Sequence, residues 1–450
     1  MELKNIQRVY LVGIGGIGMS GLARYFHHLG CVVCGYDKTS TPLTDALHNE
    51  GIRVVFEDRL DWIPMSFQKP CDGTLVIYTP AIPKDSHILN YFKNHGFDLQ
   101  KRSQVLGIIS RGMFTVAVAG THGKTTTSSM IAHILKDSGK DCSAFLGGIS
   151  SNYNTNVLYG KNDIVVVEAD EYDRSFLTLS PDTAIITSMD ADHLDIYGDH
   201  SHLEESFRLF ASQIKPGGVL ISKKGLPLEG FTYSIKEGAG AMGRNIRIED
   251  GSFHFDFDNG STSIPDIRMG IAGLHNVENA VAAIEATLRL EVSADAIREA
   301  LGSFKGVKRR FEYIVKNEKH IYIDDYAHHP EELRAAISSV RKLYPGKKLT
   351  VMFQPHLFTR TRDFVDGFAE VLDMADELLM LEIYPARELP IPGVDSNMVL
   401  GLMKLENKRL VGKQESLGII KAEQPELLLT VGAGDIDTLV NPLKEILEHV

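Results

Sequence analysis

The most constraining stretch of the chain is a glycine loop between an apolar run and a helix-forming segment. A short β-branched run contains Thr115, Val116 and Val118, and Gly-Thr-His-Gly-Lys-Thr follows at positions 120–125. From Ser128 to Lys136, apolar residues recur at helical spacing. A strand, a glycine loop and a helix together bind nucleotide phosphates, because backbone N–H groups and the helix N-terminus face the anion. The stretch predicts an α/β fold with a phosphate site made of Gly120, Thr121, His122, Gly123, Lys124, Thr125 and Thr126.

This loop is shorter than the usual phosphate loop. The common pattern places four residues between its first glycine and the Gly-Lys pair, whereas two residues separate Gly120 from Gly123. If the loop works in the usual way, Lys124 reaches the β- and γ-phosphates and the Thr125 hydroxyl binds Mg²⁺. The alternative is an ordinary strand-to-helix turn that happens to be rich in glycine and threonine.

A second glycine loop stands near the start of the chain. Gly13–Gly18 reads Gly-Ile-Gly-Gly-Ile-Gly and precedes a helical segment, and Asp37 follows the next apolar run. This is the dinucleotide fingerprint, in which a pyrophosphate lies on a helix N-terminus and a carboxylate binds a ribose. An NAD(P)-dependent dehydrogenase fits it, but a UDP-sugar offers the same two groups. A polar turn at Thr79 follows another apolar run and is expected at the same sheet edge.

Acidic residues follow two apolar runs in the middle of the chain. Glu168 ends the run 164–167, and Asp-His-Leu-Asp at 192–195 follows the run 183–186. We expect both runs to be buried parallel strands that end beside the phosphate loop. Glu168 then predicts a ligand for a nucleotide-bound Mg²⁺, and His193 a ligand for a second cation. His275 and Asn279 lie four residues apart on one face of a later helix, where they would contact a base or cap the helix.

From Lys308 onward, the strand, loop and helix order repeats as a third α/β region. The loops that follow its apolar runs carry arginine, histidine and aspartate. Arginine binds phosphate and carboxylate groups in a bidentate manner, so these loops are expected to contact anions. The stretch Gly107–Gly112, in contrast, is interpreted as a linker that leads into the phosphate loop's strand.

Composition excludes several classes of protein. A chain of 450 residues should hold about three domains, and its 43% hydrophobic and 24% charged content is typical of globular proteins. With 47 basic and 59 acidic residues, the net charge of −12 argues against nucleic acid as a partner. Cys31 and Cys34 lie in an apolar run that predicts a buried strand rather than a zinc site. The sequence shows no signal peptide or membrane-spanning stretch, so a cytoplasmic location is expected.

Taken in order, these motifs resemble the Mur ligase family of peptidoglycan synthesis. The resemblance covers nearly the whole chain, and the short phosphate loop is the family's own form. It implies an α/β protein of three domains: an N-terminal Rossmann-like UDP-binding domain (1–108), a central P-loop-type ATPase domain with a mostly parallel sheet (109–306), and a C-terminal Rossmann-like domain (307–450). The resemblance is carried by residues 13–20, 120–125, 168–171, 192–195, 275–276 with 279, 309–311, 324–330, 353–356 with 359–363, 384–387 with 390–393, and 432–435.

The resemblance also implies an activity and a set of site residues. The activity is the ATP- and Mg²⁺-dependent joining of L-alanine to the lactyl carboxylate of UDP-N-acetylmuramate through an acyl phosphate. The implied catalytic residues are Lys124, His193, Arg310, Asp325 and His328. The ATP site would add His275, Asn279, Arg310 and Asp325 to the phosphate loop. The metal ligands would be Thr125, Glu168 and His193. The UDP-substrate site would contain Gly13, Gly15, Gly16, Ile17, Gly18, Asp37, Thr79, Arg360 and Arg362.

Three other functions remain open from the sequence. A related ligase attaches a whole tripeptide to UDP-N-acetylmuramate, although the stretches 384–387 and 390–393 favour the L-alanine enzyme. The other two are a dehydrogenase built on the first glycine loop and a non-catalytic nucleotide-binding regulator. Two departures from relatives stand out. Residues 201–214 contain no lysine that could be carbamylated, and Arg174 stands where relatives often have smaller residues. The oligomeric state is left open.

Overall fold

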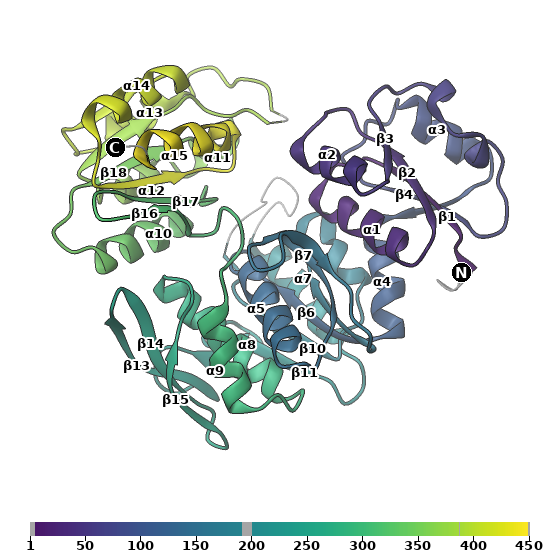
Figure 1. The fold of residues 1–450 in the computed structure, drawn as a ribbon, viewed down its shortest axis with the longest axis horizontal. Coiled ribbons are helices and arrows are strands. Elements are labelled where there is room, and N and C mark those ends of the chain that lie inside the picture. The colour runs from purple at the N-terminus through teal and green to yellow at the C-terminus, as the bar shows by residue number, and fades with distance from the viewer. Residues whose placement is uncertain (1–4, 191–199, 387, 449–450) are drawn as a thin grey trace. The chain divides into compact units, whose positions relative to one another are not determined.

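The computed structural model describes residues 5–190, 200–386 and 388–448. Contacts divide the chain into two compact units. Unit 1 comprises residues 1–244, 256–267 and 278–304, and unit 2 comprises residues 245–255, 268–277 and 305–450. Both units are built from mostly parallel sheets with helices packed on them (Figure 1). The predicted α/β class is confirmed, whereas the three domain boundaries stay a prediction.

The first sheet of unit 1 carries the first glycine loop. Its strand order is β3-β2-β1-β4-β5, and its pairs are parallel. Alternate residues of β1 bury on opposite faces: Val9 and Leu11 pack with α1 and α4, while Tyr10 and Val12 pack with α3. The elements are β1 (Arg8–Val12), α1 (Ile17–His28), β2 (Val32–Tyr36), α2 (Pro42–Asn49), β3 (Arg53–Val55), η2 (Leu60–Trp62), η3 (Met65–Phe67), β4 (Thr74–Tyr78), α3 (His87–Asn94), β5 (Asp98–Lys101) and α4 (Arg102–Gly112).

The second sheet carries the phosphate loop. Part of its strand order is β12-β11-β10-β6-β9-β7-β8, and β6 pairs in parallel with both β9 and β10. Val118 aligns with Glu168, and Ala119 aligns with Ile186, so the carboxyl ends of these three strands meet at one edge. The strands are β6 (Phe114–Ala119), β7 (Ser143–Ser150), β8 (Thr155–Leu158), β9 (Ile164–Glu168), β10 (Thr183–Ile186), β11 (Val219–Lys223), β12 (Phe231–Ser234), β13 (Ala241–Glu249), β14 (Ser252–Asp258) and β15 (Ser263–Arg268). The helices are α5 (Lys124–Asp137), η4 (Tyr172–Thr178), α7 (His200–Ser212), α8 (Leu274–Leu288) and α9 (Ala294–Ser303).

Two local expectations are corrected by the structure. Helix α5 begins at Lys124 rather than Ser128, because the threonines after Gly123 form its first turn despite their β-branched side chains. The stretch Gly107–Gly112 is not a linker but the end of helix α4. A Cβ atom at Gly107 would stand 2.4 Å from the Thr178 carbonyl oxygen, so this glycine permits the close packing of α4 against η4.

The third sheet belongs to unit 2. Its order is β16-β17-β21-β18-β19-β20, with β16 antiparallel to β17 and the other pairs parallel. The carboxyl ends of β17, β21 and β18 therefore meet at one edge. The elements are β16 (Glu312–Lys316), β17 (Ile321–Asp325), α10 (Pro330–Leu343), β18 (Leu349–Phe353), α11 (Phe358–Asp363), α12 (Val365–Leu372), β19 (Glu377–Met380), α13 (Ser396–Leu402), β20 (Lys408–Leu410), α14 (Lys413–Glu423), β21 (Leu427–Val431), η5 (Asp435–Leu439) and α15 (Val440–Glu448).

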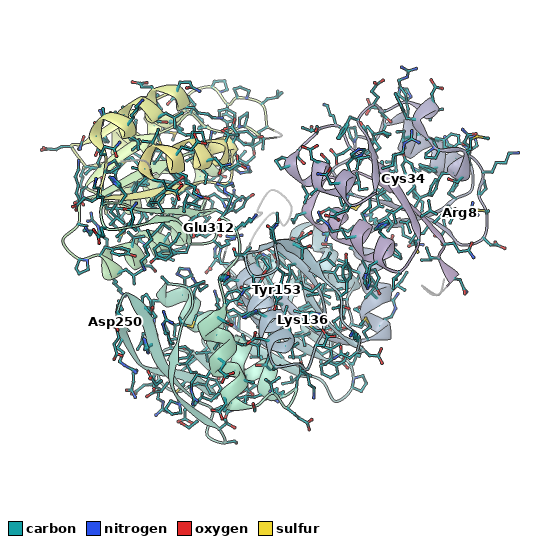
Figure 2. All side chains as sticks on the ribbon, in the orientation of Figure 1. Arg8, Cys34, Lys136, Tyr153, Asp250 and Glu312 are labelled. Carbon is teal, nitrogen blue, oxygen red and sulfur yellow. The ribbon has the colours of Figure 1, made fainter. Side chains whose placement is uncertain are left out.

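The structure agrees with the sequence interpretation of Cys31 and Cys34. Cys34 lies on β2 (Figure 2), and burial raises the pKa of its thiol to about 12. Both Cys31 and Cys34 are buried free cysteines. Within the described ranges, no helix has the length and apolar character needed to cross a bilayer.

Candidate active site

The phosphate loop turns from β6 into α5 at the carboxyl edge of the second sheet. Gly120 and Gly123 both have positive φ angles, 133° and 83°. A Cβ atom at Gly120 would stand 2.2 Å from Thr187 Oγ1, so only glycine fits between the loop and the residues after β10. The Ser188 hydroxyl accepts a hydrogen bond from the His122 amide at 2.7 Å. The loop is thereby fixed at the N-terminus of a long buried helix, as an anion site requires.

Thr125 and Glu168 place hard oxygen atoms side by side at this edge. The Thr125 hydroxyl donates to Glu168 Oε1 at 3.0 Å, and the Gly147 amide donates to Glu168 Oε2 at 2.8 Å. A Cβ atom at Gly147 would approach both carboxylate oxygens to 2.3 Å, so a glycine is needed here for Glu168 to keep its position. A hydroxyl and a carboxylate oxygen suit Mg²⁺, which completes its shell with water and phosphate oxygens. The two residues therefore fit the predicted metal site.

No larger protein cluster of metal ligands accompanies this pair in the part of the chain that the structure describes. Groups of three or more His, Cys, Asp and Glu side chains that could hold a metal are absent from the described ranges. His193, the predicted ligand of a second cation, lies outside the described residues.

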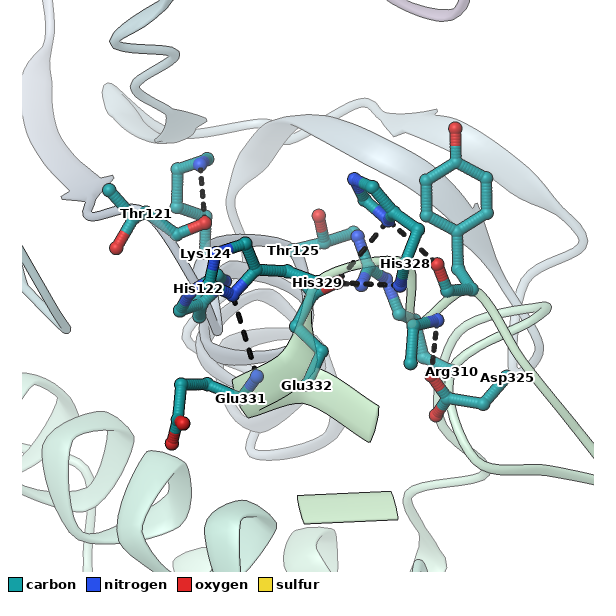
Figure 3. Close-up of polar contacts among 12 residues, drawn as sticks. Thr121, His122, Lys124, Thr125, Arg310, Asp325, His328, His329, Glu331 and Glu332 are labelled. Carbon is teal, nitrogen blue, oxygen red and sulfur yellow. Dashed lines mark hydrogen bonds and ion pairs between the residues drawn. The ribbon is translucent and has the colours of Figure 1, made fainter. Parts of the chain in front are cut away.

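Lys124 is held by a buried carboxylate that the sequence interpretation gave no role. Its ammonium lies 2.9 Å from Glu171 Oε1 and 2.8 Å from Oε2, and it donates to the Gly120 carbonyl at 2.6 Å. The Glu171 side chain is 1% exposed. Burial alone would lower the pKa of Lys124, but the charges of Glu171, Asp170 and Glu168 offset it and leave the pKa above its usual value. Lys124 is therefore a charged group aimed at the loop, with its contact to the Thr121 carbonyl drawn in Figure 3.

Asn279 lies against the phosphate loop in unit 1, and His122 is one of the loop's own residues. A Cβ atom at Gly123 would stand 2.8 Å from Asn279 Oδ1, so the amide lies directly against the loop. The imidazole Nε2 of His122 lies 3.7 Å from Asp190 Oδ2. Thr126 is buried in the first turn of α5. His275 lies at the start of α8, and its ring meets that of Phe311 edge to face at 6.4 Å.

The predicted UDP-substrate loop has its own set of contacts. The Gly15 amide donates to Asp37 Oδ2 at 2.7 Å, and a Cβ atom at Gly13 would stand 2.6 Å from the Thr79 methyl group. Gly16 is the N-cap of α1, and Ile17 and Gly18 follow in its first turn. The glycine loop, Asp37 and Thr79 are thus brought together at the carboxyl ends of β1, β2 and β4. This arrangement leaves the α1 N-terminus available to a pyrophosphate.

In unit 2, Arg310, Asp325 and His328 gather around the end of β17 (Figure 3). Asp325 accepts from the Phe311 and Ala327 amides, each at 2.7 Å, and burial raises the pKa of its carboxyl to about 6. The Arg310 guanidinium lies 5.1 Å from the centre of the Tyr326 ring.

Glu332 joins two of these predicted residues. It lies 3.9 Å from Arg310 Nη1 and 3.2 Å from His328 Nδ1, and its oxygen accepts from the His328 amide at 3.0 Å. The sequence interpretation missed Glu332 because it stands in the first turn of a helix, where acidic residues are common.

The two arginines predicted for the UDP-substrate site differ in environment, and both belong to unit 2. Arg360 is 8% exposed, and its Nη1 lies 3.4 Å from His356 Nδ1 at the end of β18. Arg362 pairs with its neighbour Asp363 at 2.7 Å, and its side chain is about half exposed. The structure therefore places Arg360, but not Arg362, at the buried end of the sheet.

Other residues near the predicted site were missed for different reasons. Glu171 was part of a recognised motif but carried no pattern that marks a lysine partner. Gly147 lies inside a β-strand, and only the position of Glu168 explains it. Arg102 stands beside the stretch interpreted as a linker, yet its guanidinium approaches both Gly18 and Asp170.

Comparisons with known proteins identify the class of protein that this fold and these loops define. Three family models match successive parts of the chain: the Mur ligase family catalytic domain over residues 8–113, the Mur ligase middle domain over residues 118–287, and the Mur ligase glutamate ligase domain over residues 309–433. The chain belongs to the Mur ligase family. The resemblance carried by the motifs is thereby confirmed.

Individual relatives are similar over their full length. The UDP-N-acetylmuramate–L-alanine ligase of Flavobacterium johnsoniae is 49% identical over 449 residues, covering 100% of both chains. The ligase of the same name from Cytophaga hutchinsonii is 50% identical over 460 residues, covering 100% of this chain and 98% of its own. Among solved structures, the UDP-N-acetylmuramate-alanine ligase of Thermotoga maritima matches with a TM-score of 0.83 at 27% identity, over 97% of this chain and 98% of its own.

Proposed function

We propose that this chain joins L-alanine to the lactyl carboxylate of UDP-N-acetylmuramate and converts ATP to ADP and phosphate in doing so. The similarity at about half identity over the whole length to ligases that carry this name supports the substrate pair. The observation that carries the proposal is the geometry at the edge of the second sheet, where Lys124, Thr125 and Glu168 converge on the phosphate loop. A pyrophosphate-type glycine loop in the same unit supports a nucleotide sugar as the second substrate.

The chemistry proceeds in two transfers. The lactyl carboxylate attacks the γ-phosphorus of ATP, which gives an acyl phosphate and ADP. The amine of L-alanine then attacks the acyl carbon, and the tetrahedral intermediate expels phosphate. The protein supplies little covalent chemistry to such a reaction, so its contribution is positioning and neutralisation of charge.

The residues of unit 1 have distinct roles in this proposal. Lys124 would neutralise the transferred phosphoryl group, because it is charged and aimed at the loop. Thr125 and Glu168 would hold the Mg²⁺, and Asn279 would contact the nucleotide beside Gly123. Bound Mg²⁺ supplies neutralisation of the phosphate oxygens. The Gly13–Gly18 loop, Asp37 and Thr79 would bind the UDP group. His193 and His275 keep the roles predicted for them, as a second metal ligand and a nucleotide contact.

The residues of unit 2 complete the proposal. Arg310 and Asp325 would contact ATP, and His328 would face the reacting groups. Glu332 would fix the orientation of Arg310 and His328. Arg360 and Arg362 would contact the UDP substrate. The assignment of residues 1–108 to UDP binding, 109–306 to ATP binding and 307–450 to ligation is part of the same proposal, as is a cytoplasmic location.

The test is phosphate release by the full-length chain with ATP, Mg²⁺, UDP-N-acetylmuramate and L-alanine, each omitted in turn. We expect release only when all four are present, and a product heavier than UDP-N-acetylmuramate by one alanine residue. Replacing L-alanine by the wall tripeptide separates this activity from that of the related peptide ligase. Turnover with the tripeptide and none with L-alanine would refute the proposal, as would NAD(P) binding with no release of phosphate.

A further inference from the structure

Arg102 begins helix α4, and its side chain lies between two segments of the candidate site in unit 1. A Cβ atom added at Gly18 would stand 2.9 Å from Arg102 Nη1 and 3.1 Å from its Cδ, so the side chain lies against the last glycine of the first loop. Its Nη2 lies 3.4 Å from Oδ2 of Asp170, which stands two residues after Glu168. A cation therefore stands next to both the predicted UDP-substrate loop and the metal-binding segment.

The contact to Asp170 leaves Arg102 able to bind a further anion. At 3.4 Å it is a long contact, and the Asp170 side chain is 40% exposed, so water weakens the pair. A guanidinium group has five N–H donors in a planar fork, and this contact uses one of them. The Arg102 side chain is 21% exposed, so a solute can reach it. Its geometry suits bidentate recognition of a phosphate or carboxylate.

We propose that Arg102 binds an anionic group of the sugar nucleotide, either its pyrophosphate or its lactyl carboxylate. This inference rests on the proposed function and adds a residue to the same site. The pyrophosphate is expected at the N-terminus of α1, where Gly18 lies in the first turn. The lactyl carboxylate must reach the segment that contains Glu168 to meet ATP. Arg102 contacts Gly18 at the first position and Asp170 at the second. Bidentate hydrogen bonds from its guanidinium would therefore fix the position of the substrate.

A purely structural role for Arg102 makes a different prediction. If its pair with Asp170 served only to fasten α4 to the segment after β9, its loss would lower stability and weaken all ligands alike. A substrate-binding role changes the dissociation constant of the UDP compounds and leaves nucleotide binding at the phosphate loop unchanged. The chain offers a matched control in Arg111, an exposed arginine in the last turn of the same helix.

The experiment is calorimetric titration of the full-length chain and of R102Q, R102K and R111Q with UDP, UDP-N-acetylmuramate and a non-hydrolysable ATP analogue. We expect R102Q to raise the dissociation constant of UDP-N-acetylmuramate by about 10- to 100-fold, the usual effect of losing a charged hydrogen bond. R102K should lie between R102Q and the wild type, because it keeps the charge and loses the fork. R111Q should match the wild type. ATP-analogue binding and the thermal midpoint should be unchanged in all variants.

Comparing UDP with UDP-N-acetylmuramate shows which of the two anionic groups Arg102 binds. Equal weakening of UDP and UDP-N-acetylmuramate in R102Q assigns the pyrophosphate, and weakening of UDP-N-acetylmuramate alone assigns the lactyl carboxylate. Wild-type affinity for both ligands in R102Q would overturn the proposal, and so would equal losses for UDP-N-acetylmuramate and the ATP analogue. A wild-type chain that binds UDP-N-acetylmuramate but releases no phosphate with L-alanine would instead refute the proposed function, while the Arg102 comparison would still stand.

Discussion

Replacing Lys124 by alanine should damage both stability and ligation, and the structure allows the two effects to be separated. The ammonium of Lys124 lies within 2.9 Å of both oxygens of Glu171, whose side chain is 1% exposed. Removing one partner of a buried ion pair costs about 3–5 kcal/mol, because the other charge stays buried without compensation. For a domain of 150–250 residues this corresponds to a thermal midpoint lower by roughly 6–20 °C.

A second substitution, Glu171→Gln, should restore stability without restoring ligation. In Lys124→Ala/Glu171→Gln the uncompensated charge is gone, so we expect the thermal midpoint to return most of the way to the wild-type value. Ligation should stay reduced by about 100-fold or more, because the lysine charge that faces the transferred phosphoryl group is still missing. Lys136→Ala is the control on the same helix: it breaks a partly buried pair with Asp141, whose side chains are 22% and 26% exposed, and should leave ligation intact.

The assays are thermal unfolding without ligands and phosphate release under saturating substrates, with UDP-N-acetylmuramate binding measured in parallel. Binding of the UDP substrate should be near normal in every variant that folds, because its predicted loop is a separate element. A double variant as unstable as Lys124→Ala would refute the ion-pair argument. Retained ligation in either variant would refute the phosphate-loop assignment.

Three further predictions use single sites. Gly147→Ala should raise the Mg²⁺ concentration needed for half-maximal phosphate release by about tenfold, because the new methyl group displaces Glu168; an unchanged Mg²⁺ titration would contradict the metal assignment. Gly15→Ala should weaken UDP binding without affecting an ATP analogue, since its Cβ atom would stand 2.8 Å from Asp37 Oδ2; equal binding by variant and wild type would count against the loop. Asp325 has a folded pKa of about 6 against an ordinary 3.8, so its ionisation removes stability as pH rises through that window. Asp325→Asn should therefore gain up to roughly 3 kcal/mol relative to wild type between pH 3.5 and 7.5 in unfolding measurements, and a pH-independent difference would show the pKa to be wrong.

Much of the fold follows from local patterns in the sequence. Continuous apolar runs such as 164–167 and 183–186 became buried parallel strands, because a strand covered on both faces shows no alternation. Polar residues that directly follow such runs were predicted to share one edge, and the register of β6, β9 and β10 brings them there. Family resemblance then joined the separate motifs into one chain of Mur ligase type.

The sequence could not predict pairs of residues that come into contact only through tertiary packing. Nothing local marks Gly147 as the donor to Glu168, or Glu171 as the partner of Lys124, because these pairs are 21 and 47 residues apart. The end of α4 was interpreted as a linker because glycines often mark turns and loops. Gly107 is instead needed for close packing against Thr178. Arg102, at the start of the same helix, lies outside that stretch and was given no role in the sequence interpretation.

The two glycine loops show why a motif identifies a ligand group rather than a reaction. Both loops present backbone amides at a helix N-terminus, so each fits a phosphate. The Gly13–Gly18 loop matches its pattern fully, but its neighbours Asp37 and Thr79 suit any nucleotide with a ribose and a pyrophosphate. The shorter loop at Gly120 has a charged lysine and two hard oxygen atoms beside it, which are the groups that phosphoryl transfer requires. The incomplete loop at Gly120 therefore determines the reaction, whereas the complete Gly13–Gly18 loop determines only which nucleotide substrate binds.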